Sequence, residues 1–108
     1  MRKFIILLSA GAVAVLMLGT VGTANEHEKK GEALFKQNCS PCHPDGGNII
    51  NPQKTLYKKD REANGVKKTA DIVAKMRNPG PGMTRFDDKS LPEKDAKEIA
   101  EYILKTFK

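Results

Sequence analysis

Five consecutive residues, Cys39-Ser40-Pro41-Cys42-His43, constrain this chain of 108 residues more than any other segment. The spacing C-x-x-C-H is the attachment signal for c-type haem. Each thiol adds across a vinyl group of the porphyrin to form a thioether, and the adjacent histidine is held where its imidazole nitrogen reaches the iron. The motif therefore predicts one covalently bound haem c, with Cys39 and Cys42 as attachment points and His43 as an axial ligand.

A C-x-x-C pair also serves thiol–disulfide exchange, and cysteines bind structural zinc. A thioredoxin-like oxidoreductase is built on a βαβ framework, for which this chain has neither the strand patterns nor the length. A structural zinc site needs four ligands, and beyond the motif only His27 and carboxylates are present. Haem attachment is the favoured interpretation, and thiol–disulfide exchange is the less favoured alternative.

The first 24 residues are typical of a cleaved secretory signal peptide. Arg2 and Lys3 precede an uncharged apolar run from Phe4 to Leu18, and Gly22-Thr23-Ala24 supplies the small residues of a cleavage site. We therefore expect an exported domain of residues 25–108, in the periplasm or an equivalent lumenal compartment. The alternative is a retained membrane anchor over residues 4–21, whose 18 residues are near the lower limit for a spanning helix.

Residues 25–108 are too few for more than one domain, and they hold little aromatic surface with which to build a core. A large apolar macrocycle would supply that core. Without Arg2 and Lys3 the domain carries 17 basic and 13 acidic residues, a net charge of +4. An exported protein without a basic-aromatic groove is not expected to bind nucleic acid. Dispersed lysines can instead steer a monomeric carrier towards acidic docking surfaces of redox proteins.

Helical signals recur along residues 25–108, and no alternating strand pattern occurs. The pattern predicts a helix over 26–38, a short turn or helix over 55–63 and a helix with Thr69 as N-cap and Asp71 in its first turn. The segment Asn78-Pro79-Gly80-Pro81-Gly82 ends that third helix. A last helix starts with Ser90 and Glu93 as a capping box and carries apolar residues on one face through Phe107. The predicted fold class is all-α, with three to four helices wrapped around one haem.

An iron that only transfers electrons needs a second axial ligand. Outside the signal segment the candidates are Met76, Met83 and His27. Met76 shares a helical face with apolar residues, which is typical of core packing, and His27 is so close to the cleavage site that we expect it to be exposed and frayed. Met83 follows a loop of alternating proline and glycine that allows close backbone approach. Met83 is the predicted ligand.

Taken together, these segments resemble the class I monohaem cytochromes c, in particular the small cytochrome c6 and c553-like group. The resemblance covers nearly all of residues 29–107, including the C-x-x-C-H motif, Pro81-Gly82-Met83 and the last helix through Tyr102. It implies that Gly31 and Phe35 meet the Tyr102 face of the last helix. Two departures stand beside Met83: Gly80-Pro81-Gly82 precedes it, and Thr84-Arg85 replaces the Pro-Ala often seen after it.

The function that follows is a shuttle of single electrons between redox proteins, with no enzymatic activity and with membrane contact only through redox complexes unless the signal segment is retained. We expect the Pro52 carbonyl to accept the hydrogen bond of the second His43 ring nitrogen. The remaining candidate haem-pocket residues are apolar: Ile50, Leu56, Ile72, Met76 and Phe86. The alternatives are an open-iron, peroxidase-like enzyme or a haem-based sensor, in which the Met83 position is vacant or labile.

Overall fold

The computed structural model describes Gly11 and residues 24–108. The predicted signal segment, apart from Gly11 and Ala24, lies outside the described residues. Every regular element of the described residues is helical, as predicted. In chain order they are α1 (Ala24–Asn38), the 3-10 turn η1 (Pro44–Gly46), α2 (Lys58–Ala63), α3 (Thr69–Arg77) and α4 (Glu93–Thr106). None of these helices has the length and apolar character needed to cross a membrane.

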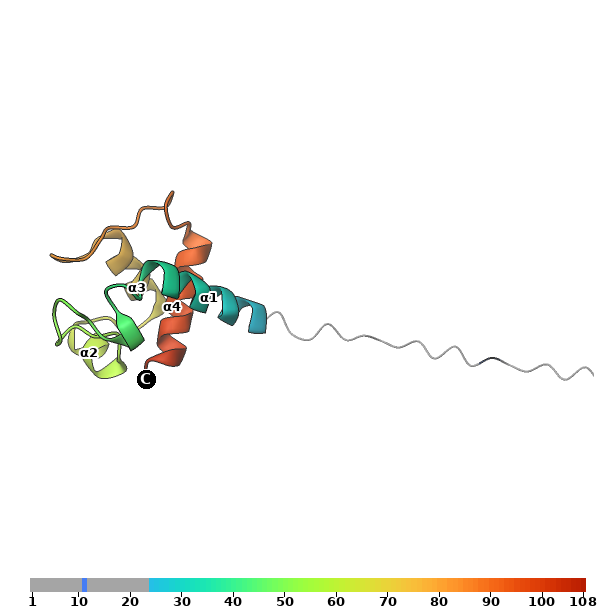
Figure 1. The fold of residues 1–108 in the computed structure, drawn as a ribbon, viewed down its shortest axis with the longest axis horizontal. Helices are drawn as coiled ribbons and strands as arrows, with labels where there is room; N and C mark the ends of the chain where they lie inside the picture. Colours follow the sequence, from blue (N-terminus) through green and yellow to red (C-terminus); the bar gives the residue numbers. More distant parts are fainter. Residues whose placement is uncertain (1–10, 12–23) are drawn as a thin grey trace, which may run out of the picture.

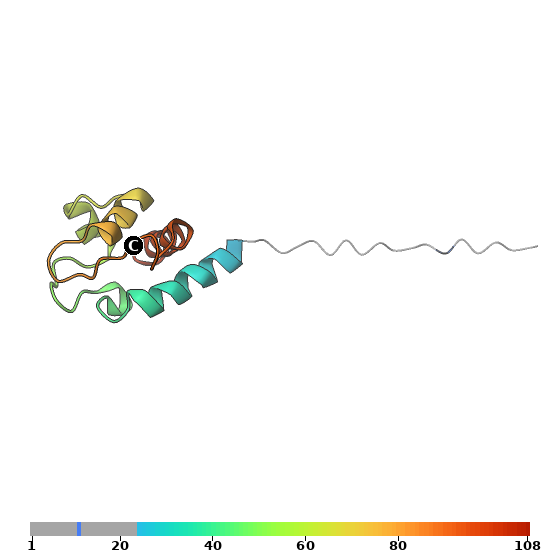
Figure 2. The ribbon, with the colours of Figure 1, turned by 90° about the horizontal axis from the view of Figure 1, so that it is seen from above.

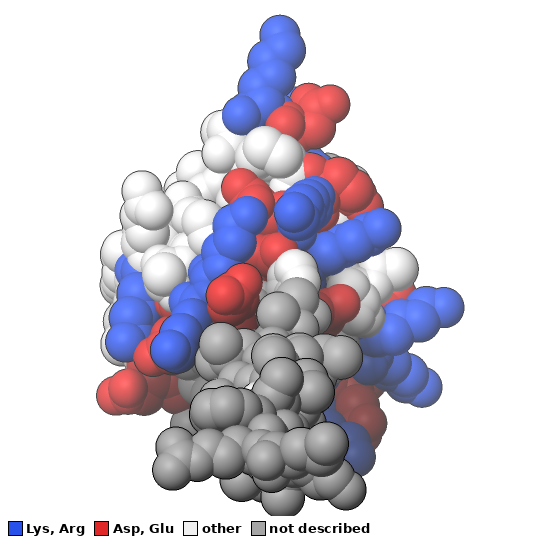
Figure 3. All heavy atoms as spheres, turned by 90° about the vertical axis from the view of Figure 1, so that its right-hand side faces the viewer, with Lys and Arg blue, Asp and Glu red and all other residues white. Residues whose placement is uncertain are grey.

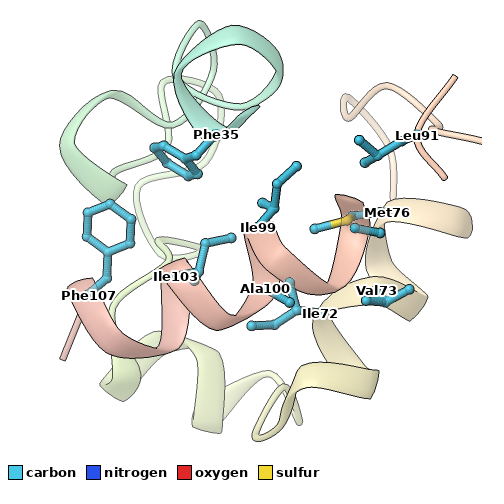
Figure 4. Packing of buried hydrophobic residues seen from close by; sticks show 10 residues of the cluster. Phe35, Ile72, Val73, Met76, Leu91, Ile99, Ala100, Ile103 and Phe107 are labelled. Carbon is cyan, nitrogen blue, oxygen red and sulfur yellow. The ribbon is translucent and has the colours of Figure 1, made fainter. Parts of the chain in front are cut away.

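Helix α4 is the centre of the fold, because both α1 and α3 pack against it (Figure 1). Its apolar residues recur every three or four positions, and Ala96, Ile99, Ala100 and Ile103 are almost completely buried. Figure 4 shows Ile99 and Ile103 of α4 with Phe35 of α1 on one side and Met76 of α3 on the other. The predicted apolar faces of α3 and α4 therefore form one core with Phe35 of α1.

An aromatic cluster holds the carboxyl end of α4 in place. The rings of Phe35 and Phe107 lie 5.3 Å apart, as do those of Phe35 and Tyr102, and Tyr57 adds an edge-on contact with Phe107 at 5.7 Å. Tilted and edge-on pairs at this spacing are favourable beyond the area they bury. The resemblance predicted that Phe35 and Tyr102 would meet, and this is confirmed.

The predicted close approach at Gly31 is also confirmed. A Cβ atom added there would lie 2.5 Å from the carbonyl oxygen of Glu98 and 3.1 Å from the Cβ of Tyr102. A glycine inside a helix costs about 1 kcal/mol relative to alanine. Here that cost is offset because the missing side chain lets the backbones of α1 and α4 touch.

Ion pairs reinforce the seam between α1 and α4. His27 Nδ1 lies 3.0 Å from Glu98 Oε1, Lys30 Nζ lies 3.1 Å from Asp95 Oδ1, and Lys105 bonds to Glu28. His27 is exposed, as predicted, but it is helical and tethered to Glu98 rather than frayed. On the face drawn in Figure 3, basic and acidic side chains are interspersed, so this side of the molecule carries no field of a single sign.

Two helix starts differ from the prediction. Helix α4 begins at Glu93 with Pro92 as its N-cap, because Ser90 is already occupied: its backbone N–H and its hydroxyl both donate to Asp87 Oδ1, at 2.7 and 2.9 Å. The N-cap of α3 is Lys68 rather than Thr69. There the Asp71 carboxylate accepts from the backbone N–H groups of Lys67 and Lys68, at 3.0 and 3.1 Å, and supplies the cap.

Candidate haem site

Two irregular segments, residues 39–57 and 78–92, leave the helical scaffold on the same side of the molecule (Figures 1 and 2). A cavity of about 560 Å³ lies between them. This volume is within the range of small-molecule and cofactor pockets. The C-x-x-C-H motif lines the cavity with Cys39, Cys42 and His43, and the opposite loop lines it with Gly80, Pro81, Gly82 and Met83.

The motif begins where α1 ends. The backbone N–H of Cys39 still donates to the Phe35 carbonyl at 2.8 Å, and His43 N–H donates to the Cys39 carbonyl at 2.8 Å, which curls the motif into one further turn. Cys39 and Cys42 form no disulfide with each other. Burial raises the pKa of the Cys39 thiol to about 11, and the neighbouring Cys42 adds to this shift. Reactive redox cysteines have a lowered pKa, and the pKa of Cys39 is shifted in the opposite direction.

The ring of His43 is oriented by a backbone carbonyl, as expected, but the acceptor is not Pro52. His43 Nδ1 donates to the Gly47 carbonyl oxygen at 2.7 Å. Residues 44–46 form the tight turn η1, in which Asp45 and Gly46 both have positive φ, and this turn brings the Gly47 carbonyl back beneath the imidazole. With Nδ1 engaged as a donor, Nε2 is left as the nitrogen that can bind a metal.

Met83 is half-buried and faces the same cavity as His43. Its backbone N–H lies 3.5 Å from the Gly80 carbonyl, and the intervening Gly82 has a φ of +88°, a value that L side chains rarely adopt. A Cβ atom on Gly82 would be 3.4 Å from Ile50, so the loop touches the far wall of the cavity at this point.

The six predicted pocket residues divide into two groups. Ile50, Leu56, Ile72 and Met76 line the cavity, although Ile50 is 58% exposed and stands at its mouth rather than in the core. Pro52 is exposed, and neither it nor Phe86 is among the lining residues. Phe86 instead packs against the core cluster and donates its backbone N–H to the Met76 carbonyl at 2.9 Å.

Several polar residues of the cavity wall were not predicted, and Arg61, Asn48 and Lys75 are three of them. Arg61 is only 5% exposed and donates to two carbonyls, Nε to Leu56 at 2.6 Å and Nη2 to Phe107 at 3.1 Å. Asn48 fixes the loop by accepting from the backbone N–H groups of residues 50 and 51, and Lys75 lines the cavity from α3. The Gly-Gly-Asn run could have indicated the turn at Asn48, whereas no sequence pattern singles out a buried Arg61.

The donor set of the cavity fits a c-type haem. Two thiols, one imidazole with a free Nε2 and one thioether line a single cavity, together with apolar side chains from α3 and α4. Histidine and methionine are the axial pair of electron-carrying cytochromes c. The fold and the site together define a small helical haem protein.

Comparisons with known proteins agree with this class. A family model described as cytochrome c oxidase, cbb3-type, subunit III matches residues 26–103. Cytochrome c6 of Synechocystis is 42% identical over 74 residues, which cover 68% of this chain and 61% of that protein, just under two thirds of its length. Cytochrome c6 of Cyanidium caldarium is 32% identical over 104 residues, covering 96% of this chain and 94% of that protein.

Solved structures give the same result. The outer membrane cytochrome OmcF of Geobacter sulfurreducens is 46% identical, with a TM-score of 0.71 over 72% of this chain and 99% of OmcF. Cytochrome c6A of Arabidopsis thaliana is 32% identical, with a TM-score of 0.64 over 71% of this chain and 86% of that one. The chain belongs to the c6-like class I cytochromes c. Its cofactor is one covalently attached haem c, and this family carries electrons rather than catalysing reactions.

Proposed function

We propose that this chain shuttles single electrons between redox proteins through a haem attached at Cys39 and Cys42 and ligated by His43 and Met83. The observation that carries the proposal is the shared cavity, because all four side chains line it although 40 positions separate His43 from Met83. A haem held by these four residues would supply an iron that can gain and lose one electron.

The contributions of the protein to this activity are positional and electrostatic. The 2.7 Å bond from Nδ1 to the Gly47 carbonyl fixes the imidazole plane of His43 and leaves Nε2 as the nitrogen that can bind iron. The Met83 thioether is a soft ligand that favours the ferrous state and raises the potential. The apolar side chains of Leu56, Ile72 and Met76 exclude water from the cavity, which acts in the same direction.

The chain offers a matched test of the Met83 assignment, because Met76 lines the same cavity. The holoprotein is produced with haem-attachment machinery, and the weak far-red absorbance band of methionine-ligated ferric haem is compared in wild type, Met83→Leu and Met76→Leu. We expect the band to be lost only in Met83→Leu. Loss only in Met76→Leu would transfer the ligand role to Met76.

Two further outcomes would overturn the electron-carrier proposal. A wild-type protein that lacks the band and binds carbon monoxide when reduced would have an open iron, as in a peroxidase-like enzyme or a sensor. A protein without covalent haem, in which Cys39→Ala and Cys42→Ala leave the visible spectrum unchanged, would support thiol–disulfide exchange as the role of the two cysteines.

We further propose that residues 1–24 are a cleaved signal peptide and that the monomeric domain acts in the periplasm or an equivalent lumen. The mass of the protein from the periplasmic fraction should correspond to a chain that starts at Asn25. Recovery of full-length protein from the membrane fraction would support the retained anchor instead.

The proposed partners are redox proteins with acidic docking surfaces. Lys54 and Lys75 line the haem cavity, whereas the face in Figure 3 is mixed in charge. Electrostatic steering by these lysines predicts that electron exchange with an acidic partner slows as ionic strength rises. A rate that does not change between low and high salt would argue against acidic docking.

A further inference from the structure

One guanidinium group holds the segment that follows Met83. Arg77 is the last residue of α3, and its Nη1 donates to the backbone carbonyls of Phe86, Asp87 and Leu91, at 3.3, 2.8 and 2.7 Å. Its Nη2 lies 3.5 Å from Glu93 Oε2, at the first residue of α4. A single side chain therefore connects the end of α3 to the segment that leads into α4.

The loop that carries Met83 is also closed at the carboxyl end of α3. Arg85 Nε donates to the carbonyl of Arg77 at 2.9 Å, and Phe86 N–H donates to the carbonyl of Met76 at 2.9 Å. Residues 78–85 thus leave α3 and return to it. Backbone carbonyls at a helix end have no partner within the helix, and here the returning loop supplies one.

Between these ends the loop has little support of its own. Gly80, Pro81 and Gly82 are exposed, and the backbone hydrogen bond that spans them, from Met83 N–H to the Gly80 carbonyl, is 3.5 Å long. An exposed segment with few hydrogen bonds has a low free energy of local opening. The place of the Met83 thioether in the cavity is therefore set mainly where the loop meets α3.

We propose that Arg77 is a positioning residue for Met83: its side chain anchors residues 86–91, directly after the loop, and so keeps the thioether at the cavity. This inference rests on the proposed role of Met83 as a haem ligand. The geometry demands arginine, because a planar guanidinium offers five N–H donors, whereas a lysine ammonium is a point charge that cannot reproduce the same fork.

The test uses the ferric holoprotein and imidazole as a competitor for the Met83 position. In Arg77→Gln and Arg77→Lys, we expect imidazole to bind about tenfold more tightly than in wild type. Tenfold corresponds to about 1.4 kcal/mol, which is close to the contribution of one hydrogen bond to a charged group. We also expect faster amide exchange in peptides spanning residues 78–91. Lys94→Gln removes one positive charge from an exposed position on α4 and should leave both quantities unchanged.

A purely structural role is separated from a positioning role by Gly31→Ala, which loosens the α1–α4 seam without touching the loop. If Arg77→Gln and Gly31→Ala lower the free energy of unfolding equally and tighten imidazole binding equally, the proposal is wrong. It is also wrong if both Arg77 variants bind imidazole as wild type does.

If Met83 is not a haem ligand, the spectra and the imidazole affinities give a different result. Wild type and Met83→Leu would then show the same spectrum and the same imidazole affinity, and amide exchange alone would decide on Arg77. Faster exchange of residues 78–91 in the Arg77 variants would support the anchoring role, and unchanged exchange would overturn it.

Discussion

Replacement of Gly31 by alanine tests whether backbone contact between α1 and α4 holds the fold together. The new Cβ atom would lie 2.5 Å from the carbonyl oxygen of Glu98 and 3.1 Å from the Cβ of Tyr102. Carbon and carbonyl oxygen atoms normally approach to about 3.3–3.6 Å, so the first contact is short by roughly 1 Å. Both neighbouring atoms belong to or are fixed by the α4 backbone, and no rotamer change relieves the overlap.

The expected change in the free energy of unfolding of Gly31→Ala follows from two opposing effects. Alanine is favoured over glycine in a helix interior by about 1 kcal/mol, whereas overpacking of a well-packed contact costs about 1–3 kcal/mol. Moving the helices apart would also weaken the contact between the rings of Phe35 and Tyr102, which are 5.3 Å apart. We expect a net loss of about 1–2 kcal/mol, or about 5–15 °C in the melting temperature of a domain of this size.

The assay is guanidinium unfolding of the holoprotein, followed by helical circular dichroism. Ala33→Gly is the matched control, because Ala33 is an exposed residue of the same helix and should lose about 1 kcal/mol through helix propensity alone. If Gly31→Ala is as stable as wild type, or more stable, the helices do not depend on this contact and our reasoning about the seam is refuted.

Three further substitutions test the polar part of the structure. Lys75→Gln should lower the midpoint potential of the haem by about 20 mV in low salt and by less in high salt, because a cation at the cavity disfavours ferric iron. A spectroelectrochemical titration measures this potential. Hydrogen bonds from the backbone N–H and hydroxyl of Ser90 lower the pKa of Asp87. The ionised Asp87 carboxylate therefore stabilises the fold above the usual carboxyl pKa, and this stabilisation is lost as the pH falls through the lowered pKa. The difference in unfolding free energy between wild type and Asp87→Asn should therefore shrink from pH 7 to pH 3. Arg61→Met should lose about 2–3 kcal/mol in guanidinium unfolding, because one buried and one partly buried carbonyl lose their donor.

The helices could be predicted from the sequence because their apolar spacing reports which face is buried. Ile72, Val73 and Met76 on α3, and Ile99 and Ile103 on α4, are all buried where their spacing predicted a shared face. Helix starts were less predictable, since several polar side chains can serve the same free N–H groups. Only the three-dimensional structure decides which of the competing side chains is nearest.

The lining of the cavity was predictable where its residues are adjacent in the sequence. The C-x-x-C-H motif forms one wall of the cavity, and Met83 faces the same space from a distant loop. The hydrogen-bond acceptor of His43 was mispredicted because its position depends on the backbone of Asp45. This non-glycine residue has a φ of 52°, which the sequence does not indicate. The contacts of Arg61 with residues 56 and 107 depend on chain segments that meet only in the folded protein.

Arg61 and Arg77 show how so small a domain supports the walls of a large cavity. Helices α1 and α3 bury their apolar faces against α4, whereas the segments over residues 39–57 and 78–92 that border the cavity contain no α-helix and only the short turn η1. Arg61 fastens the first of these segments to the carboxyl end of α4, and Arg77 fastens the second to the end of α3. Each uses several donors on one rigid group, which an exposed lysine cannot provide. The positive charges of these residues therefore lie in two environments: Lys54 and Lys75, which we propose to steer a partner, are exposed, whereas Arg61 and Arg77 hold the walls of the cavity to the helices.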